Sequence, residues 1–242
     1  MGHRTHPYWS GLLRVGPGWA LLDSVIGDNC PHAHLAPQII LPRGPAVSVE
    51  TDARKYVLRD RALYLPSSIR HKIGPINIPV RSLYLDPFFT PKGREKAKAP
   101  FFVSEAASQK LAEIEEDSAL SKWCDHNLGV ALRDDGPLRF LVEPTTADIR
   151  LTPAALARSM GVSPRVLRTK SLKAYGVTTR KLTQWVQLKL AARAVAEGAS
   201  LASAAHIGGF SDQAHFTRRL VQWFGVTPHA ALANMELDFH GE

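Results

Sequence analysis

Four polar side chains in the first third of the chain have types and spacing that suit a binding site. His32 and His34 are separated by one residue, so on a strand both imidazoles point to the same face. Gln38 follows, and His71 comes after a turn anchored at Pro66. Three imidazoles with an open position suit Zn²⁺ or Fe²⁺. The neutral amide of Gln38, in contrast, is a poor ligand for a hard metal ion.

We therefore expect His32, His34, Gln38 and His71 to line the mouth of a small β-barrel and to bind a small polar effector, with neither a metal nor a cofactor. Tyr8 and Trp9 lie in an N-terminal arm that could close over an occupied site. Two alternatives stay open on the residues alone: a metal site, or a polar end of the barrel that binds nothing.

A second set of chemically suggestive residues lies in Ser200–Pro228. Ser200 is predicted to cap a short helix, Gly208 and Gly209 to supply the turn, and Ser211 to cap a second helix. Two short helices joined by a glycine-containing turn form a helix-turn-helix unit. The second helix would bury an apolar stripe and expose polar and cationic side chains, as a recognition helix in the major groove requires. The stripe is Phe216, Leu220, Trp223 and Phe224, and the exposed residues are Gln213, His215, Thr217, Arg218 and Arg219.

The same plan occurs earlier in the chain. Thr152 is predicted to cap a helix that begins at Pro153, and Ser163 to cap a helix that runs toward Gly176. The exposed face of this first recognition helix would carry Arg165, Arg168, Thr169 and Lys173. Residues 179–197 are predicted to form one amphipathic helix between the units, with about 1.5 Å of rise per residue. Such a spacer would let two recognition helices enter successive major grooves of one DNA duplex.

The residues before these units alternate and break as short strands do. Predicted strands cover 19–25, 37–41, 46–50, 56–65 and 80–85, with residues 1–18 as a loosely packed arm. Helices are predicted for 104–116 and 118–132. Residues 134–137, Asp-Asp-Gly-Pro, are the best boundary between domains, and everything after them is predicted to be helical. The fold class is therefore α+β: a small antiparallel β-barrel with flanking helices in residues 1–134, and an all-α domain in residues 135–242.

Composition fits a protein that binds a polyanion. The chain has 242 residues and a net charge of +8. Between Arg165 and Arg219 there are ten Lys or Arg residues against two acids, Glu197 and Asp212. No apolar run could span a membrane, the N-terminus lacks a signal-peptide pattern, and two cysteines are too few for a disulfide scaffold, so a cytoplasmic location is expected.

Residues from about 138 to 234 resemble the DNA-binding domain of the AraC/XylS family of bacterial transcription regulators. The resemblance is carried by LTPAALARSMGVSPRVL, by the helix ending AARAVAEG, and most specifically by GGFSDQAHFTRRLVQWFGVTP. The strand-rich front, with PHAH at residues 31–34, resembles the cupin-like effector domain of many family members. This chain departs from the family pattern at Ser171, where a large apolar residue is usual, and Leu172 falls on the outward stripe instead.

The resemblance implies which side chains contact DNA. Base edges would be contacted by Arg165, Arg168 and Thr169 from the first recognition helix, and by Gln213, Ala214, Thr217 and Arg218 from the second. Arginine suits guanine and glutamine suits adenine. Lys173, Lys189, His215 and Arg219 are better candidates for phosphate contacts, which position the protein without specifying sequence.

The function predicted on these grounds is that of a DNA-binding transcription regulator, not an enzyme, controlled by a small-molecule effector. Its expected partners are double-stranded DNA, the effector, a second copy of the chain in a homodimer, and RNA polymerase. The alternative is a cupin-type metal-dependent enzyme with an accessory basic helical domain. An enzyme of that kind needs a complete ligand set, which Gln38 argues against, whereas both recognition helices that a regulator needs are present.

Overall fold

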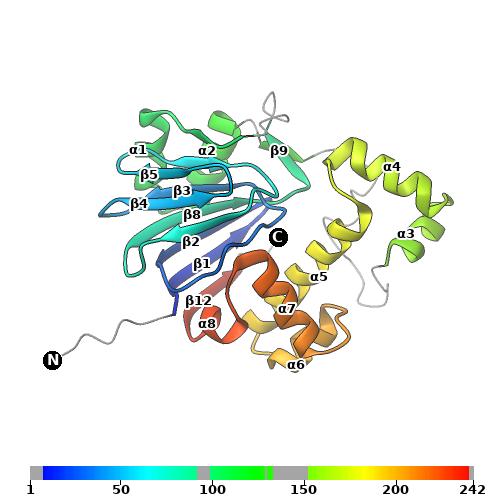
Figure 1. The fold of residues 1–242 in the computed structure, drawn as a ribbon. Helices are drawn as coiled ribbons and strands as arrows, with labels where there is room; N and C mark the ends of the chain where they lie inside the picture. Colours follow the sequence, from blue (N-terminus) through cyan, green and yellow to red (C-terminus); the bar gives the residue numbers. More distant parts are fainter. Residues whose placement is uncertain (1–7, 92–98, 129, 133–151, 240–242) are drawn as a thin grey trace. The chain divides into compact units, whose positions relative to one another are not determined.

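Two groups of elements make up the chain in the computed structural model, which describes residues 8–91, 99–128, 130–132 and 152–239 (Figure 1). Contacts divide the chain into a first unit, Met1–Ala131 with Leu220–Glu242, and a second, Leu132–Arg219. We call them the sheet unit and the helical unit. No helix in the described ranges is long and apolar enough to cross a bilayer.

A seven-stranded sheet forms the frame of the sheet unit. Its strand order is β10-β6-β3-β8-β2-β1-β12, and every described pair in it is antiparallel except β1 with β12. β3 is buried on both faces, which its continuous apolar sequence Ile-Ile-Leu explains. The strands are β1 Ser10–Gly16, β2 Trp19–Val25, β3 Gln38–Pro42, β6 Leu63–Leu65, β8 Pro79–Leu85, β10 Phe101–Phe102 and β12 Asn234–Phe239.

A three-stranded sheet packs on one face of the larger sheet. It consists of β4 Val47–Thr51, β5 Lys55–Leu58 and β7 His71–Gly74, in the order β5-β4-β7. Alternate residues of both sheets point into one buried core, for example Val49 and Ile73 from the smaller sheet and Ile40 and Val80 from the larger. The two sheets form an open cupin-like barrel, because the seven-stranded sheet does not close on itself. A further pair, β9 Phe89–Pro91 with β11 Val130–Leu132, completes the described strands.

Helices α1 Glu105–Glu113 and α2 Asp117–Leu128 cover the opposite face of the larger sheet (Figure 1). Leu111 and Trp123 from these helices share a second core with Leu21 and Leu83 of the sheet. Arg81, only 1% exposed, lies at this interface. Its guanidinium donates to both carboxylate oxygens of Asp23, at 2.6 and 2.8 Å, and to carbonyl oxygens at the end of α1. A buried cation is thus fully paired, as burial of charge requires.

The helical unit contains two helix-turn-helix units and the long helix between them, except for the end of the last helix from Leu220 onward, which belongs to the sheet unit. The first is α3 Pro153–Ser159 with α4 Pro164–Tyr175, and the second is α6 Leu201–Ile207 with α7 Gln213–Phe224. α5, Thr179–Ala196, has 18 residues and is therefore about 27 Å long. Leu182 and Trp185 bury one face of α5 in the unit.

Most of the predicted helix starts are confirmed. The side-chain oxygens of Thr152, Ser163 and Ser200 each accept a hydrogen bond from a backbone N–H of the first turn. In the second turn Gly209 has φ +75, a conformation that favours glycine, whereas Gly208 has φ −70. Gly208 is needed for close packing instead, since a Cβ there would lie 2.6 Å from the carbonyl oxygen of Gln187.

The predicted cap at Ser211 is wrong. The residue that caps α7 is Asp212, whose carboxylate accepts from the backbone N–H of His215 at 2.6 Å. Ser211 donates to that carboxylate, so it positions the cap. These two hydrogen bonds hold the pKa of Asp212 below its usual value, and a negative charge at a helix N-terminus is favourable.

Four predictions for the strands need correction, and so does one for a helix, because residues 130–132, predicted as the end of a helix, form β11. The supposed arm contains β1, and Trp9 is 7% exposed in the core between the sheets, not on a mobile segment. Residues 56–65 form two strands in different sheets, since a bend at residues 59–61 separates β5 from β6. His71 begins a strand, β7, that was not predicted. The segment after α8 Pro228–Leu232 is β12, a strand, although only helix was predicted there. The proposed domain boundary at 134–137 lies outside the described residues.

Candidate functional sites

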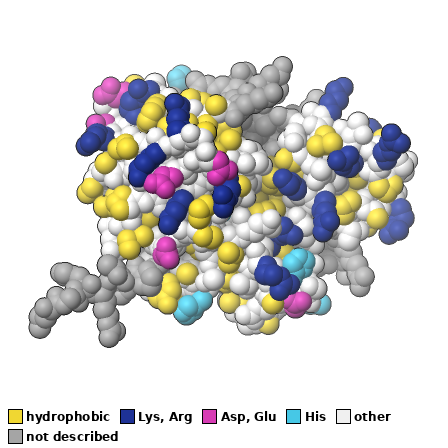
Figure 2. Space-filling model, viewed as in Figure 1, with side chains coloured by type: hydrophobic (Ala, Val, Ile, Leu, Met, Phe, Trp, Pro, Cys, Tyr) yellow, Lys and Arg dark blue, Asp and Glu magenta, His cyan; other side chains and the backbone are white. Residues whose placement is uncertain are grey.

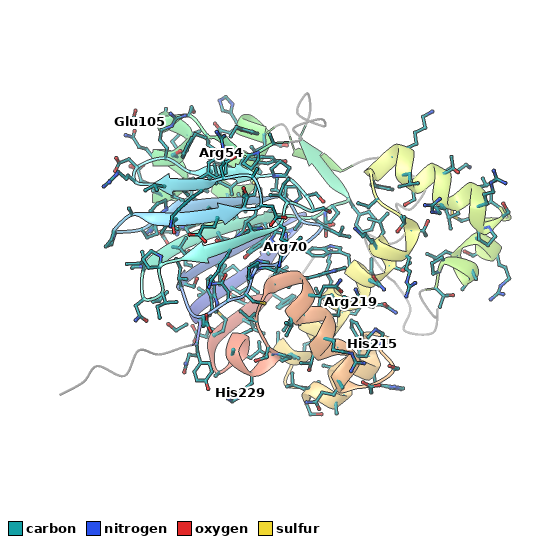
Figure 3. All side chains as sticks on the ribbon, viewed as in Figure 1. Arg54, Arg70, Glu105, His215, Arg219 and His229 are labelled. Atoms are coloured by element: carbon teal, nitrogen blue, oxygen red, sulfur yellow. The ribbon has the colours of Figure 1, made fainter. Side chains whose placement is uncertain are left out.

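The predicted contact residues of the second recognition helix share one face of α7. Gln213, Ala214 and Arg218 are exposed, and Thr217 is partly exposed. Phe216 and Trp223 of the predicted apolar stripe are buried, at 3% and 5% exposure. His215 and Arg219 are labelled on α7 in Figure 3 and are half-buried.

His215 and Arg219 differ from the exposed residues of α7 in their surroundings. The Nδ1 of His215 lies 3.2 Å from the hydroxyl of Ser211. Burial, and secondarily the nearby charge of Arg180, lowers the pKa of Arg219. Both side chains are thus less free to move than the exposed residues of α7.

The first recognition helix, α4, presents its predicted contact residues to solvent as well. Arg165, Arg168, Thr169 and Lys173 are all exposed. Thr169 donates its hydroxyl proton to the carbonyl oxygen of Arg165 at 3.1 Å, which leaves the oxygen lone pairs free to accept.

The departure from the family pattern at Ser171 has a clear structural outcome. Ser171 is fully buried and donates to the carbonyl oxygen of Val177 at 2.8 Å, so it fastens α4 to the turn before α5. Leu172 is 39% exposed, four and seven residues after Arg168 and Arg165 on the recognition face. Apolar side chains contact the methyl group of thymine in protein–DNA complexes, and Leu172 was not among the candidate contacts predicted from the sequence. Its helical spacing from Arg165 was the available signal.

Basic side chains predominate on the helical unit. Figure 2 shows Lys and Arg over the helices of this unit, whereas most of the Asp and Glu side chains in view lie over the sheet unit. The segment from Arg165 to Arg219 contains ten Lys or Arg residues and only two acids. One of the acids, Glu197, is paired with Arg193 at 3.0 Å. The surface therefore suits a polyanion.

The histidine cluster, defined here as His32, His34 and His71, is brought together inside the sheet unit. All three rings are buried, at 6%, 3% and 2% exposure, and one nitrogen of each lies within 4.8 Å of the others. A backbone bridge between His32 and His71 aligns two of the rings, with N–H···O distances of 2.8 and 2.9 Å. Gln38 is fully buried beside them. The sequence predicted this set correctly as neighbours.

Backbone carbonyl groups fix the tautomer of each imidazole. The Nδ1 atoms of His32, His34 and His71 lie 2.9, 2.6 and 2.9 Å from carbonyl oxygens two residues away in the chain. A carbonyl oxygen only accepts, so each Nδ1 carries the proton. Each Nε2 therefore presents a lone pair, the form in which histidine binds a metal or accepts from a ligand.

The amide of Gln38 joins the histidine cluster to two hydroxyl groups. One amide atom lies 3.2 and 3.1 Å from the Nε2 atoms of His34 and His71, and the other lies 3.1 Å from the hydroxyls of Ser82 and Tyr84. If the NH₂ group faces the imidazoles, it donates to both lone pairs and the two hydroxyls donate to the oxygen. If the oxygen faces them, the amide oxygen and the Nε2 lone pairs are all acceptors close to one another. A bound cation or a ligand with hydrogen-bond donors would stabilise that arrangement.

Burial keeps the cluster neutral. Desolvation, with a smaller contribution from His32, lowers the pKa of His34 to about 4. Desolvation lowers the pKa of His32, and desolvation with the charges of His34 and His32 holds the pKa of His71 well below its usual value. Neutral imidazoles retain the lone pairs that ligand binding needs.

The cluster does not lie at an open mouth, because the end of α7 covers it. Phe224 stacks on His34, with ring centroids 5.5 Å apart and planes at 21°, and meets Tyr84 edge-on. Gly225 follows, and its carbonyl oxygen accepts from the backbone N–H of Cys30 at 3.1 Å. Ser82 and Tyr84 could have been found from the alternation of β8. Nothing in the sequence indicated that Phe224 and Gly225 cover the histidine cluster.

Comparisons with known proteins agree with this architecture. Residues 156–234 match the model of a helix-turn-helix domain family. Solved structures of ToxT from Vibrio cholerae share the fold. Apo ToxT K231A aligns with a TM-score of 0.61 and 12% identity, over 89% of this chain and 97% of that one. ToxT with an unsaturated fatty acid bound aligns with a TM-score of 0.55 and 13% identity, over 95% and 96%. No curated protein sequence matches the chain.

The family match spans the helices from α4 to α8, and the likeness to the ToxT structures shows the fold of the chain. Both findings agree with the resemblance to AraC/XylS regulators.

Proposed function

We propose that this protein represses or activates transcription by binding a specific DNA sequence through α4 and α7, under the control of a ligand at the histidine cluster and Gln38. Two exposed, basic recognition faces within one matched helix-turn-helix domain carry the proposal. It acts as a regulator rather than an enzyme, in the bacterial cytoplasm, as a homodimer that contacts RNA polymerase at its promoters.

Selection of duplexes from a random library, followed by anisotropy titration at fixed salt, tests the DNA-binding part. The wild-type protein should prefer the selected duplex to a scrambled one by at least about a thousandfold. Equal affinity for both duplexes would contradict the proposal. Arg193→Ala is a matched control for lost charge, because Arg193 pairs with Glu197 on α5 and lies on neither recognition helix.

The effector site is proposed on the chemistry of its acceptors. Three Nε2 lone pairs and the Gln38 amide suit a small polar molecule that offers hydroxyl or amine donors. That ToxT, a protein of the same fold, has been crystallised with a fatty acid bound supports a ligand-binding role for this domain.

Replacing His32 and His71 together with alanine should abolish the effector response in a promoter-reporter assay, and the double variant should still bind the selected duplex specifically. His126→Ala, an exposed histidine on α2, is the control. A double variant that still responds normally would exclude the site. Loss of DNA binding in a well-folded double variant would indicate a structural role.

A divalent cation is a second candidate ligand, favoured by the fixed tautomers. Each Nδ1–H is already bonded to a carbonyl group, an arrangement that orients the other nitrogen of metal-binding histidines. Imidazole ligands suit Zn²⁺, and the amide oxygen of Gln38, which lies 3.2 and 3.1 Å from the Nε2 atoms of His34 and His71, would add a fourth donor.

Metal analysis after purification and equilibration with Zn²⁺ decides between the candidates. One zinc per chain, lost in His34→Ala and kept in His126→Ala, would establish the cation. Less than about a tenth of an equivalent of zinc in the wild-type protein would exclude the cation and leave the organic effector as the candidate ligand.

A further inference from the structure

α7 belongs to both units of the structure, and its two ends have different neighbours. The residues that face DNA in the proposed function, Gln213 to Arg219, lie in the helical unit, whereas Leu220–Phe224 and everything after them lie in the sheet unit. The helix is continuous across that division. A continuous helix transmits a displacement of one end to the other, because its backbone hydrogen bonds keep it rigid over 12 residues.

The C-terminal end of α7 is seated directly on the histidine cluster. Phe224 stacks on His34. Gly225 has φ +72 and leaves no room for a side chain, since a Cβ would lie 2.4 Å from the carbonyl oxygen of Cys30 and 2.7 Å from Nδ1 of His32. A ligand that moves either ring must therefore move this helix end or be excluded by it. We call Phe224 and Gly225 the junction.

The segment after the junction fastens it to the sheet. Val226 and Met235 pack against the core between the two sheets. β12 then pairs with β1 in parallel over six residues, from Ser10 opposite Asn234 to Val15 opposite Phe239. Figure 1 shows β12 beside β1 at the edge of the sheet, with α8 just before it. The edge strand thus holds the junction in place from its C-terminal side.

We propose that β12 and the junction form an intramolecular latch that restrains the second recognition helix, and that ligand at the histidine cluster acts by unseating Phe224 and Gly225. The inference deepens the proposed function and rests on it. Its new content is the route: ligand binding and DNA binding both favour the released helix, the ligand through a direct contact with the junction, and β12 sets the balance between the held and released states. By linkage, DNA that favours the released helix must also loosen the latch.

Full-length variants test the latch without any ligand. Met235→Asp with Leu237→Asp places charge on the half-buried face of β12, and Asn234→Ala with Glu236→Ala alters only its exposed face as a control. Affinity for the selected duplex should rise at least fivefold in the first variant and change less than twofold in the control. Unchanged or weaker binding in a first variant whose sheet unit still melts cooperatively would overturn the proposal.

A double-mutant cycle tests the contact at the junction. Phe224→Ala and His34→Ala should each raise DNA affinity, and the double variant should gain no more than the larger single effect, because both remove one contact. Additive effects would refute the route through Phe224. Phe224→Leu keeps an apolar side chain over the cluster, so its DNA affinity should lie between those of the wild type and Phe224→Ala. This variant guards against a result caused by misfolding.

Hydrogen exchange provides the reciprocal measurement. Saturating the wild-type protein with the selected duplex should speed exchange of the β1 amides and of the Cys30 amide, and should leave β3 protected. Unchanged exchange of the β1 amides would overturn the latch proposal. Failure of the wild-type protein to bind any duplex specifically would instead contradict the proposed function on which the latch rests.

Discussion

Gly225→Ala should destabilise the sheet unit through two separable effects. The first is backbone conformation: alanine at φ +72 costs about 1–2 kcal/mol. The second is overlap, since the new Cβ would lie 2.4 Å from the Cys30 carbonyl oxygen, an atom held in place by the backbone. Relieving overpacking of this kind costs about 1–3 kcal/mol. The sum is a loss of about 2–5 kcal/mol in the free energy of unfolding.

Gly176→Ala isolates the first effect. Gly176 has φ +70, nearly the same as Gly225, yet a Cβ there would meet nothing within 4 Å. Its cost should therefore be about 1–2 kcal/mol. Urea unfolding, monitored by far-UV circular dichroism and tryptophan fluorescence, measures both variants against wild type. Equal losses would refute the argument from close contact, because backbone conformation alone would then account for the effect at Gly225.

Three further outcomes are expected. Arg218→Ala should weaken binding to the selected duplex by about 1–3 kcal/mol and relax preference at one base pair in a repeated selection; equal loss on random DNA would make it a phosphate contact. Gly209→Val should lower both the melting temperature and DNA affinity, because a β-branched residue is strained at φ +75; full stability and binding would show that glycine is not required. In metal-free protein, the free energy of unfolding should fall as pH drops from about 6.5 toward 4. In this range His34 is protonated in the unfolded state but stays neutral in the folded state, where its pKa is about 4. That histidine alone contributes about 3 kcal/mol, measurable by urea unfolding at each pH; a flat profile in wild type, or an unaltered one in His34→Ala, would contradict it.

The sequence predicted the helical unit well because its signals are local. Caps at Thr152, Ser163 and Ser200 and the paired glycines at 208–209 each act within one or two turns of chain. The error at Ser211 arose because Asp212 stands next to it and both can cap a helix.

The sheet unit was predicted less completely because its pairings are distant in sequence. The histidines were grouped correctly since they flank recognisable strands and a turn. β12 was missed although Asn-Met-Glu-Leu-Asp-Phe alternates polar and apolar residues, because a strand forms only with a partner and that partner, β1, lies more than two hundred residues earlier. Contacts of this kind depend on tertiary structure, not on local propensity.

The position of β12 in the chain also affects how the protein is made. Synthesis proceeds from the N-terminus, so β1 emerges from the ribosome long before its outer neighbour exists. At about 5–20 residues per second, the interval is roughly 10–45 s. During that time one margin of the nascent sheet carries unpaired backbone groups, which attract other extended chains. A nascent chain that stalls within the helical unit would keep that margin open, and chaperones would have to shield it until translation resumes.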